Sequence, residues 1–92
     1  MSEKTIYKYG IGIQDLVHLS LPVDSKILTF QAQGMGIYIW VLHDVAPLKR
    51  ELRAFRIYGT GHQISESEKL DYIGTTQVAG FVWHLFEESI DV

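Results

Sequence analysis

The segment Phe55–Ile64, FRIYGTGHQI, brings together residue types that bind phosphate. Arg56 and Tyr58 lie two positions apart in an alternating run, so they are predicted to share one face of a strand. The glycine-containing stretch 59–62 follows directly, and successive backbone N–H groups in such a turn can form a nest for an anion. The sequence therefore predicts an anion-binding site here. The alternative is a strand end with a bulge, where the glycines only permit the bend.

Two residues outside this stretch complete the predicted site. Arg53 is placed at its rim, and Trp40 offers a plane for stacking if its strand is adjacent. Arg56 would hold a phosphate through two N–H groups, whereas the alternative is pairing with a surface acid such as Glu51 or Glu66. The predicted ligand-binding residues are Trp40, Arg53, Arg56, Tyr58, Gly59, Thr60, Gly61 and His62.

The sequence gives little indication of metal binding or of nucleophilic catalysis. Its four histidines, His18, His43, His62 and His84, show no metal-binding spacing, and there is no cysteine. The serines lie in no nucleophile elbow, and no repeated H-x-[ST] unit is present. We therefore expect no metal, no cofactor and no enzymatic activity. His84 lies in an apolar segment and is predicted to be a core or interface histidine with one satisfied nitrogen.

The bulk composition indicates one globular domain over residues 1–92, since 47% of residues are hydrophobic and 21% are charged. The formal net charge of −3 disfavours general nucleic-acid binding. No apolar stretch approaches the roughly 18 residues of a membrane span, so no membrane association is predicted. A cytoplasmic location is expected.

Period-two alternation dominates the sequence and predicts strands separated by turns. The expected fold is all-β, or β-rich α+β: a small antiparallel sandwich or partly open barrel of about six to seven strands. Hairpin turns are predicted at 34–36 and at Ala79-Gly80, and one short helical turn is allowed within 62–71, capped by Ser65. The strands are expected within 4–13, 16–21, 26–33, 37–43, 51–59, 72–78 and 81–87.

The alternation also predicts which residues form the core, and the small number of strands predicts exposed sheet edges. Segment 37–43 is apolar on both faces, which is typical of a central strand or of one whose outer face contacts something else. Small sheets with little helix leave exposed edges, so a homo-oligomer is expected. The predicted core residues are Leu19, Leu28, Phe30, Ile39, Val41, Phe55, Ile57, Val82 and Phe86.

Six ordered blocks resemble a family of short phage and bacterial proteins of unknown function. They are Lys4–Ile6, Leu21–Leu28, Trp40–Pro47, Phe55–Ile64, Tyr72–Gln77 and Val82–Glu87. The resemblance spans nearly the whole chain and implies a compact β-rich protein in an infected bacterial host. It implies no activity and no catalytic residues. Residues 37–39 are more apolar than the family pattern, for which an extra interface is one explanation.

Three functions remain open on the sequence. The first is an oligomeric anti-defence protein that sequesters a nucleotide-like signal, with arginine and the turn for phosphate and an aromatic ring for the base. The second is an inhibitor that binds a host defence enzyme such as a nuclease or a CRISPR component. The third is a structural or assembly accessory. A pocket lined by Arg and His would favour the first, and a flat patch would favour the second.

Overall fold

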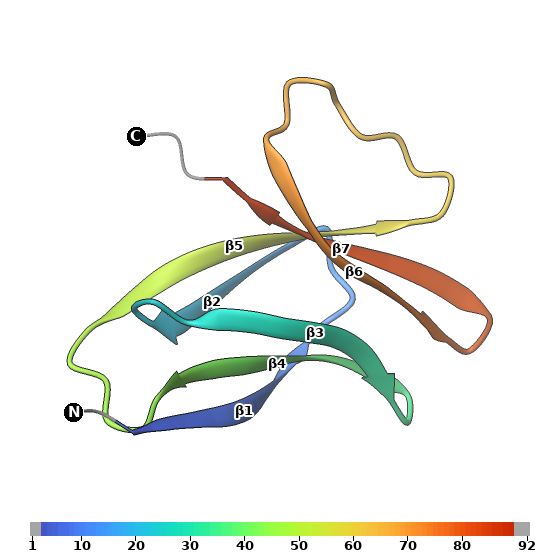
Figure 1. Ribbon diagram of the computed structural model, residues 1–92. Helices are drawn as coiled ribbons and strands as arrows, with labels where there is room; N and C mark the ends of the chain where they lie inside the picture. Colours follow the sequence, from blue (N-terminus) through green and yellow to red (C-terminus); the bar gives the residue numbers. More distant parts are fainter. Residues whose placement is uncertain (1–2, 90–92) are drawn as a thin grey trace.

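The computed structural model describes residues 3–89, which form seven antiparallel strands in two sheets (Figure 1). The all-β prediction is confirmed, and the described residues contain no helix and no closed barrel. The allowed helical turn is instead a tight turn in which the Glu68 N–H donates to the Ser65 carbonyl at 3.1 Å. The strands are β1 (Lys4–Ile11), β2 (Leu16–Pro22), β3 (Lys26–Gln33), β4 (Gly36–Asp44), β5 (Arg50–Gly59), β6 (Leu70–Val78) and β7 (Phe81–Glu88).

The chain crosses between the two sheets after β1, after β2 and after β4. The three-stranded sheet has the order β1-β4-β3, and the four-stranded sheet has the order β2-β5-β7-β6. Two hairpins, β3–β4 and β6–β7, are closed by two-residue turns as predicted. Gly34 and Gly80 have φ values of +61° and +85°, which glycine adopts without steric cost. Below, the inner face of each sheet is the one that faces the other sheet.

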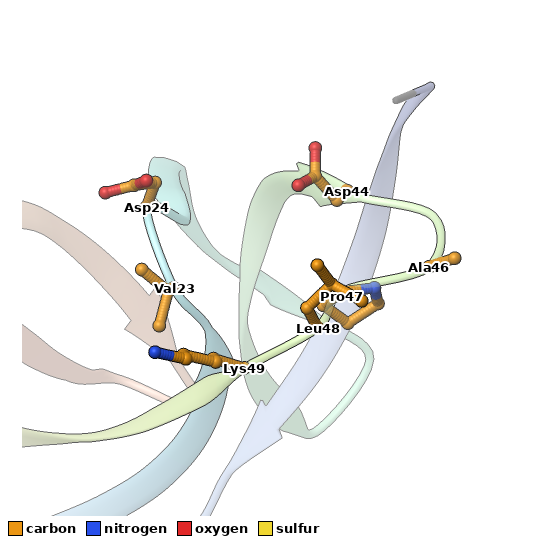
Figure 2. A pocket seen from close by; sticks show the side chains of 7 residues that line it. All are labelled: Val23, Asp24, Asp44, Ala46, Pro47, Leu48 and Lys49. Atoms are coloured by element: carbon orange, nitrogen blue, oxygen red, sulfur yellow. The ribbon is translucent and has the colours of Figure 1, made fainter. Parts of the chain in front are cut away.

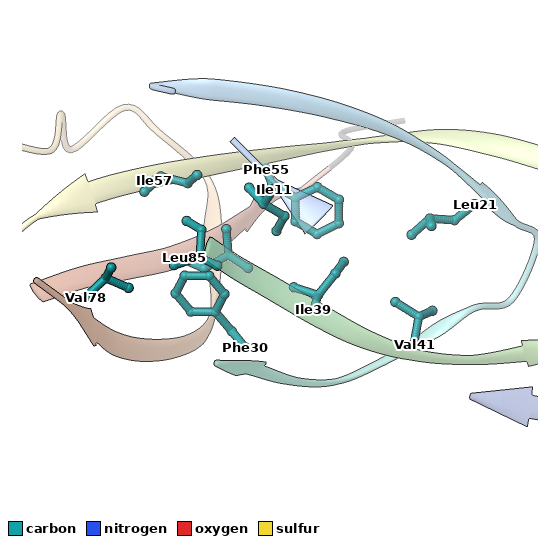
Figure 3. Close-up of a cluster of buried hydrophobic side chains, with 10 residues drawn as sticks. Ile11, Leu21, Phe30, Ile39, Val41, Phe55, Ile57, Val78 and Leu85 are labelled. Atoms are coloured by element: carbon teal, nitrogen blue, oxygen red, sulfur yellow. The ribbon is translucent and has the colours of Figure 1, made fainter. Parts of the chain in front are cut away.

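The core lies between the inner faces (Figure 3). Central strand β4 contributes every second residue, because successive side chains of a strand point to opposite faces. Of the predicted core, Phe30, Ile39, Val41, Phe55 and Ile57 are buried, and Leu19 packs against them. The sequence prediction missed Ile11, Leu21, Ile37, Val78 and Leu85, which are buried as well.

Three core predictions are wrong, for two physical reasons. A β-bulge between Ile27 and Thr29 makes Leu28 the extra residue, so Leu28 leaves the core and is 42% exposed. Val82 and Phe86 lie on the outer face of β7, because the buried residue of that strand is Leu85. Strand β7 carries apolar residues on both faces, so its sequence does not indicate which face is directed into the core.

The sandwich is closed along one side and open along the other. On the closed side β3 approaches β6, and the Ala32 N–H donates to the Thr76 hydroxyl at 2.9 Å. Gly74 lies at this approach, where a Cβ would be in van der Waals contact with the Cβ of Phe30, 3.4 Å away. On the open side, β1 pairs only with β4 and β2 pairs only with β5 within residues 3–89. Strands β1 and β2 therefore form the two free edges of the sandwich.

Candidate functional site

Three aromatic rings lie together on the outer face of the four-stranded sheet. Tyr58 and Phe86 pack edge to face with ring centroids 5.7 Å apart, and Tyr72 packs on Phe86 at 5.4 Å. They come from neighbouring strands β5, β7 and β6, and cross-strand register places Tyr72 directly opposite Phe86. Tyr72 is 61% exposed although it is a large aromatic residue. We call Tyr58, Tyr72 and Phe86 the aromatic patch.

A row of polar groups runs beside the aromatic patch and is centred on His84. Its Nε2 lies 2.9 Å from the Thr60 hydroxyl, and its Nδ1 lies 2.9 Å from the Thr75 hydroxyl. The Thr75 hydroxyl also lies 2.6 Å from the Tyr72 hydroxyl. In a neutral imidazole one nitrogen donates and the other accepts, so the two threonines take opposite roles. These bonds hold the imidazole ring in a fixed orientation at the surface.

Arg56 shares the outer face with Tyr58, as predicted, but its charge is already paired. Its Nε donates to Glu88 Oε1 at 2.5 Å across the β5–β7 pair. This hydrogen bond is the largest cause of a raised pKa of the Arg56 guanidinium, opposed by a smaller desolvation. The predicted alternative, an ion pair with a surface acid, is therefore present, with Glu88 rather than Glu51 or Glu66 as the acid. A phosphate at this position would have to compete with a carboxylate.

Residues 59–62 form a tight turn whose backbone donors are used within the chain. The His62 N–H donates to the Gly59 carbonyl at 3.1 Å, and the Thr60 N–H donates to the Val82 carbonyl at 3.3 Å. The Gly59 N–H donates to the His62 Nδ1 at 3.0 Å. Gly61 has φ +93°, so the turn requires glycine at this position. An anion nest here would have to replace these three internal bonds.

The structure separates Arg53 from the rest of the predicted site. Arg53 lies on the inner face of β5, the face of Phe55 and not that of Arg56. Its Nε and Nη2 donate to the two oxygens of Glu87 at 2.5 and 2.6 Å, and its Nη1 donates to the Ser25 carbonyl at 2.6 Å. The hydrogen bonds to Glu87 raise the pKa of the guanidinium above its ordinary value. Arg53 therefore ties β5 to β7 and to the β2–β3 turn.

Trp40 lies on the three-stranded sheet, so the condition for its stacking role, a strand adjacent to β5, is not met. Its ring packs edge to face on Tyr38 with centroids 6.1 Å apart, on the outer face of β4. The second apolar face predicted for residues 37–43 is thus the outer face of a central strand. Trp40 and the aromatic patch point away from opposite sides of the sandwich.

Two hollows lie at opposite ends of β5. The hollow beside the 59–62 turn measures about 470 Å³ and is lined by Gly59, Thr60, His62, Gly80, Phe81, Val82 and Trp83. The exposed ring of Phe81 stacks near that of Trp83, with centroids 6.1 Å apart and planes at 28°. The other hollow, of about 560 Å³, lies between the β2–β3 turn and the β4–β5 loop (Figure 2). It contains no residue of the predicted site.

Four residues of the observed site were missed by the sequence analysis: Tyr72, Thr75, His84 and Phe86. His84 lies half-buried on an outer face and not in the core, and both of its nitrogens have partners where one was predicted. A signal was available, because His84 and Phe86 have the same parity in β7 and so share a face. Their pairing with β6 depends on a second bulge, between Tyr72 and Gly74.

No helix in residues 3–89 is long and apolar enough to cross a membrane. Within that range, no three His, Asp or Glu side chains gather where a metal ion could be held. Searches among curated proteins and among solved structures found no match. A family model, described as "Domain of unknown function (DUF7352)", matches residues 2–91. The chain therefore belongs to this family, which agrees with the predicted resemblance to a family of unknown function.

Proposed function

We propose that the chain is a non-enzymatic binding protein whose aromatic patch contacts another protein. The observation that carries the proposal is the patch itself: three rings in mutual contact on an outer sheet face, flanked by hydrogen-bonded polar groups and an ion pair. Protein interfaces have this anatomy, with an aromatic centre and a polar rim. Sheet faces of this kind bind flat surfaces, whereas small ligands favour concave sites.

The charge around the patch favours one class of partner. Glu88 lies beside the patch with its charge paired to Arg56, Glu68 is close enough to act on Arg56, and the whole chain carries a net charge of −3. An acidic protein is complementary to a basic surface, and complementary potentials speed encounter and exclude wrong partners. Enzymes that handle nucleic acid have such basic surfaces. A host defence nuclease is therefore the partner class that we propose, which makes the chain a protein inhibitor of the anti-defence type.

The proposal predicts a position-specific contact at Tyr72. A photo-crosslinking amino acid at Tyr72, in bacterial cells, is expected to capture a protein that the same group at Gln31 does not capture. Gln31 is exposed on the outer face of the other sheet and is the matched control. With the purified partner, Tyr72→Ala should weaken binding by at least about 30-fold, as expected for an interface hot spot. Equal capture at both positions, or unchanged affinity of Tyr72→Ala, would contradict the proposal.

A second function, binding of a nucleotide-like ligand, is favoured by the hollow beside residues 59–62. Phe81 is 65% exposed at this hollow and offers a stacking plane, while His62 and Thr60 supply polar groups. Bases stack on aromatic side chains without strong sequence preference. Arg56 does not line this hollow, so the phosphate would be held less strongly than the sequence analysis expected.

Isothermal titration with a panel of cyclic and linear nucleotides tests this second function. If a nucleotide binds in the hollow, Phe81→Ala should weaken binding by about five- to 150-fold, since stacking contributes about 1–3 kcal/mol per base. Tyr72→Ala, on the outer face, should bind it as the unchanged chain does. Absence of binding by the folded chain would leave the aromatic patch as the candidate site.

A further inference from the structure

Among the four edge strands of residues 3–89, β1 is the one that has neither a bulge nor a proline. Exposed edges present unpaired N–H and C=O groups, and most proteins block them with bulges, proline or a covering segment. Strand β3 has its bulge at Leu28, β6 has one at Ile73, and the two strands lie against each other. Strand β2 ends in Pro22. Strand β1 keeps an unbroken register with β4 from Lys4 to Ile11 and lies at the border of its sheet (Figure 1).

The alternation of the β1–β4 ladder shows which groups point to the open edge. The Val45 N–H donates to the Glu3 carbonyl at 2.9 Å, so this pair is hydrogen-bonded. In an antiparallel ladder, hydrogen-bonded and non-hydrogen-bonded pairs alternate along the strand. Odd-numbered residues of β1 are therefore bonded to β4. The backbone groups that point away from β4 belong to Lys4, Ile6, Lys8 and Gly10.

We propose that β1 pairs with β1 of a second copy of this chain, antiparallel and centred on Tyr7. This register is symmetric about a two-fold axis, as a closed dimer requires. Lys4 then lies opposite the partner's Gly10, and Ile6 lies opposite the partner's Lys8. Each residue of β1 whose backbone groups point away from β4 then has a partner. The two three-stranded sheets become one sheet of six strands.

The charges of β1 select this register over its neighbours. Centring the pair on Ile6 would place Lys4 against the partner's Lys8, and centring it on Lys8 would place two copies of Lys8 together. Like charges directly opposite are destabilising. In their own chain, Lys4 is paired with Asp44 at 3.0 Å, and Lys8 donates to Gln33 at 2.7 Å while lying over a tyrosine ring. These lysines are therefore turned toward their own sheet.

Tyr7 supplies the side-chain contact at the two-fold axis. It lies on the inner face of β1, where its ring meets His43 edge to face with centroids 5.0 Å apart. The ring is nevertheless 53% exposed, because the open side of the sandwich leaves β1 uncovered. In the proposed dimer the two Tyr7 residues form a non-hydrogen-bonded pair, where facing side chains are closest. The inference is independent of the aromatic patch, which lies on the other sheet.

Tyr7→Cys tests the register directly, since the chain has no cysteine of its own. Cα atoms in a non-hydrogen-bonded pair lie about 4.5 Å apart, within the range that a disulfide spans. Mild oxidation is therefore expected to convert most of the Tyr7→Cys protein into a covalent dimer. Thr5→Cys is the matched control on the same face of β1. Its two copies would lie four residues apart along the ladder, about 13 Å, and should not crosslink.

Light scattering of the unchanged protein gives the second measurement. The expected mass is twice the 10.5 kDa of one chain. Ile6→Pro removes one outward N–H and leaves the β1–β4 bonds intact, so it should shift the mass to that of the monomer while the β-sheet circular dichroism is kept. A monomeric wild-type chain, a dimeric Ile6→Pro variant or equal crosslinking of the two cysteine variants would overturn the proposal. If Ile6→Pro fails to fold, the cysteine pair decides the question alone.

Discussion

Phe30→Ala is expected to lower the free energy of unfolding by about 3–5 kcal/mol. The Phe30 ring is 3% exposed and packs in the core where β3 approaches β6 at Gly74. Truncation removes its apolar contacts and leaves a cavity at the closed side of the sandwich, which surrounding strands cannot fill without breaking their pairing. For a domain with a total stability of about 5–10 kcal/mol, this loss is near the limit of folding.

Leu28→Ala is the control for this prediction. Leu28 lies two residues earlier on the same strand and has the same parity, yet the bulge turns it to the outside. Its truncation should cost less than about 1 kcal/mol, as is usual for exposed positions. Urea denaturation of the two variants measures both values. A Phe30→Ala loss no greater than that of Leu28→Ala would show that the bulge is misplaced.

Arg53→Ala is expected to lower the free energy of unfolding by about 2–4 kcal/mol. This exceeds the 0–1 kcal/mol of exposed ion pairs and overlaps the lower part of the 3–5 kcal/mol lost when one partner of a buried pair is removed. The Arg53 and Glu87 side chains are 15% and 19% exposed, and both guanidinium–carboxylate bonds are short. The substitution leaves the Glu87 carboxylate without its partner in a poorly hydrated place and frees the β2–β3 turn at Ser25.

Arg56→Ala provides the matched comparison, because Arg56 lies on the same strand and is also paired with a glutamate of β7. The Arg56 and Glu88 side chains are 29% and 30% exposed, so solvent screens their attraction. We expect a loss of about 0–1 kcal/mol. Thermal and urea unfolding of both variants would measure the difference. Equal losses would mean that the inner position of Arg53 contributes nothing.

The alternation of side chains made the strands predictable from the sequence, as in β5, where Phe55 and Ile57 face inward and Arg56 and Tyr58 outward. The same alternation indicated the inner position of Arg53, because Arg53 lies two residues before the buried Phe55 and so shares its face. The sequence analysis instead assigned Arg53 to the anion site because of its charge. A charged residue on an inner face needs a buried partner, and Glu87 lies 34 positions away along the chain. Such a distant pairing is not encoded in local spacing.

Two features of the site depend on long-range structure alone. Whether Trp40 could reach Tyr58 depends on sheet order, and residues that are near in sequence, in β4 and β5, belong to different sheets. The second feature is which side chains face the core beyond a bulge, because the extra residue exchanges the two faces of the strand. Neither Leu28 nor Ile73 has a local pattern that identifies it as the extra residue, because the bulges accommodate the close approach of β3 and β6.

The way the chain crosses between the two sheets has a consequence for the order of folding. The β3–β4 and β6–β7 hairpins join neighbouring segments through two-residue turns, so their loop-closure entropy is small. Strands β1 and β2 must find partners much further along the sequence, β4 and β5. Contacts of large sequence separation form slowly, and we therefore expect β1 and β2 to dock last. The strand whose edge we propose for self-pairing would then become available only when the monomer is nearly complete. Association would thus act as a final step that selects finished chains, and a chain stalled before β1 docks would expose the edge of β4 instead.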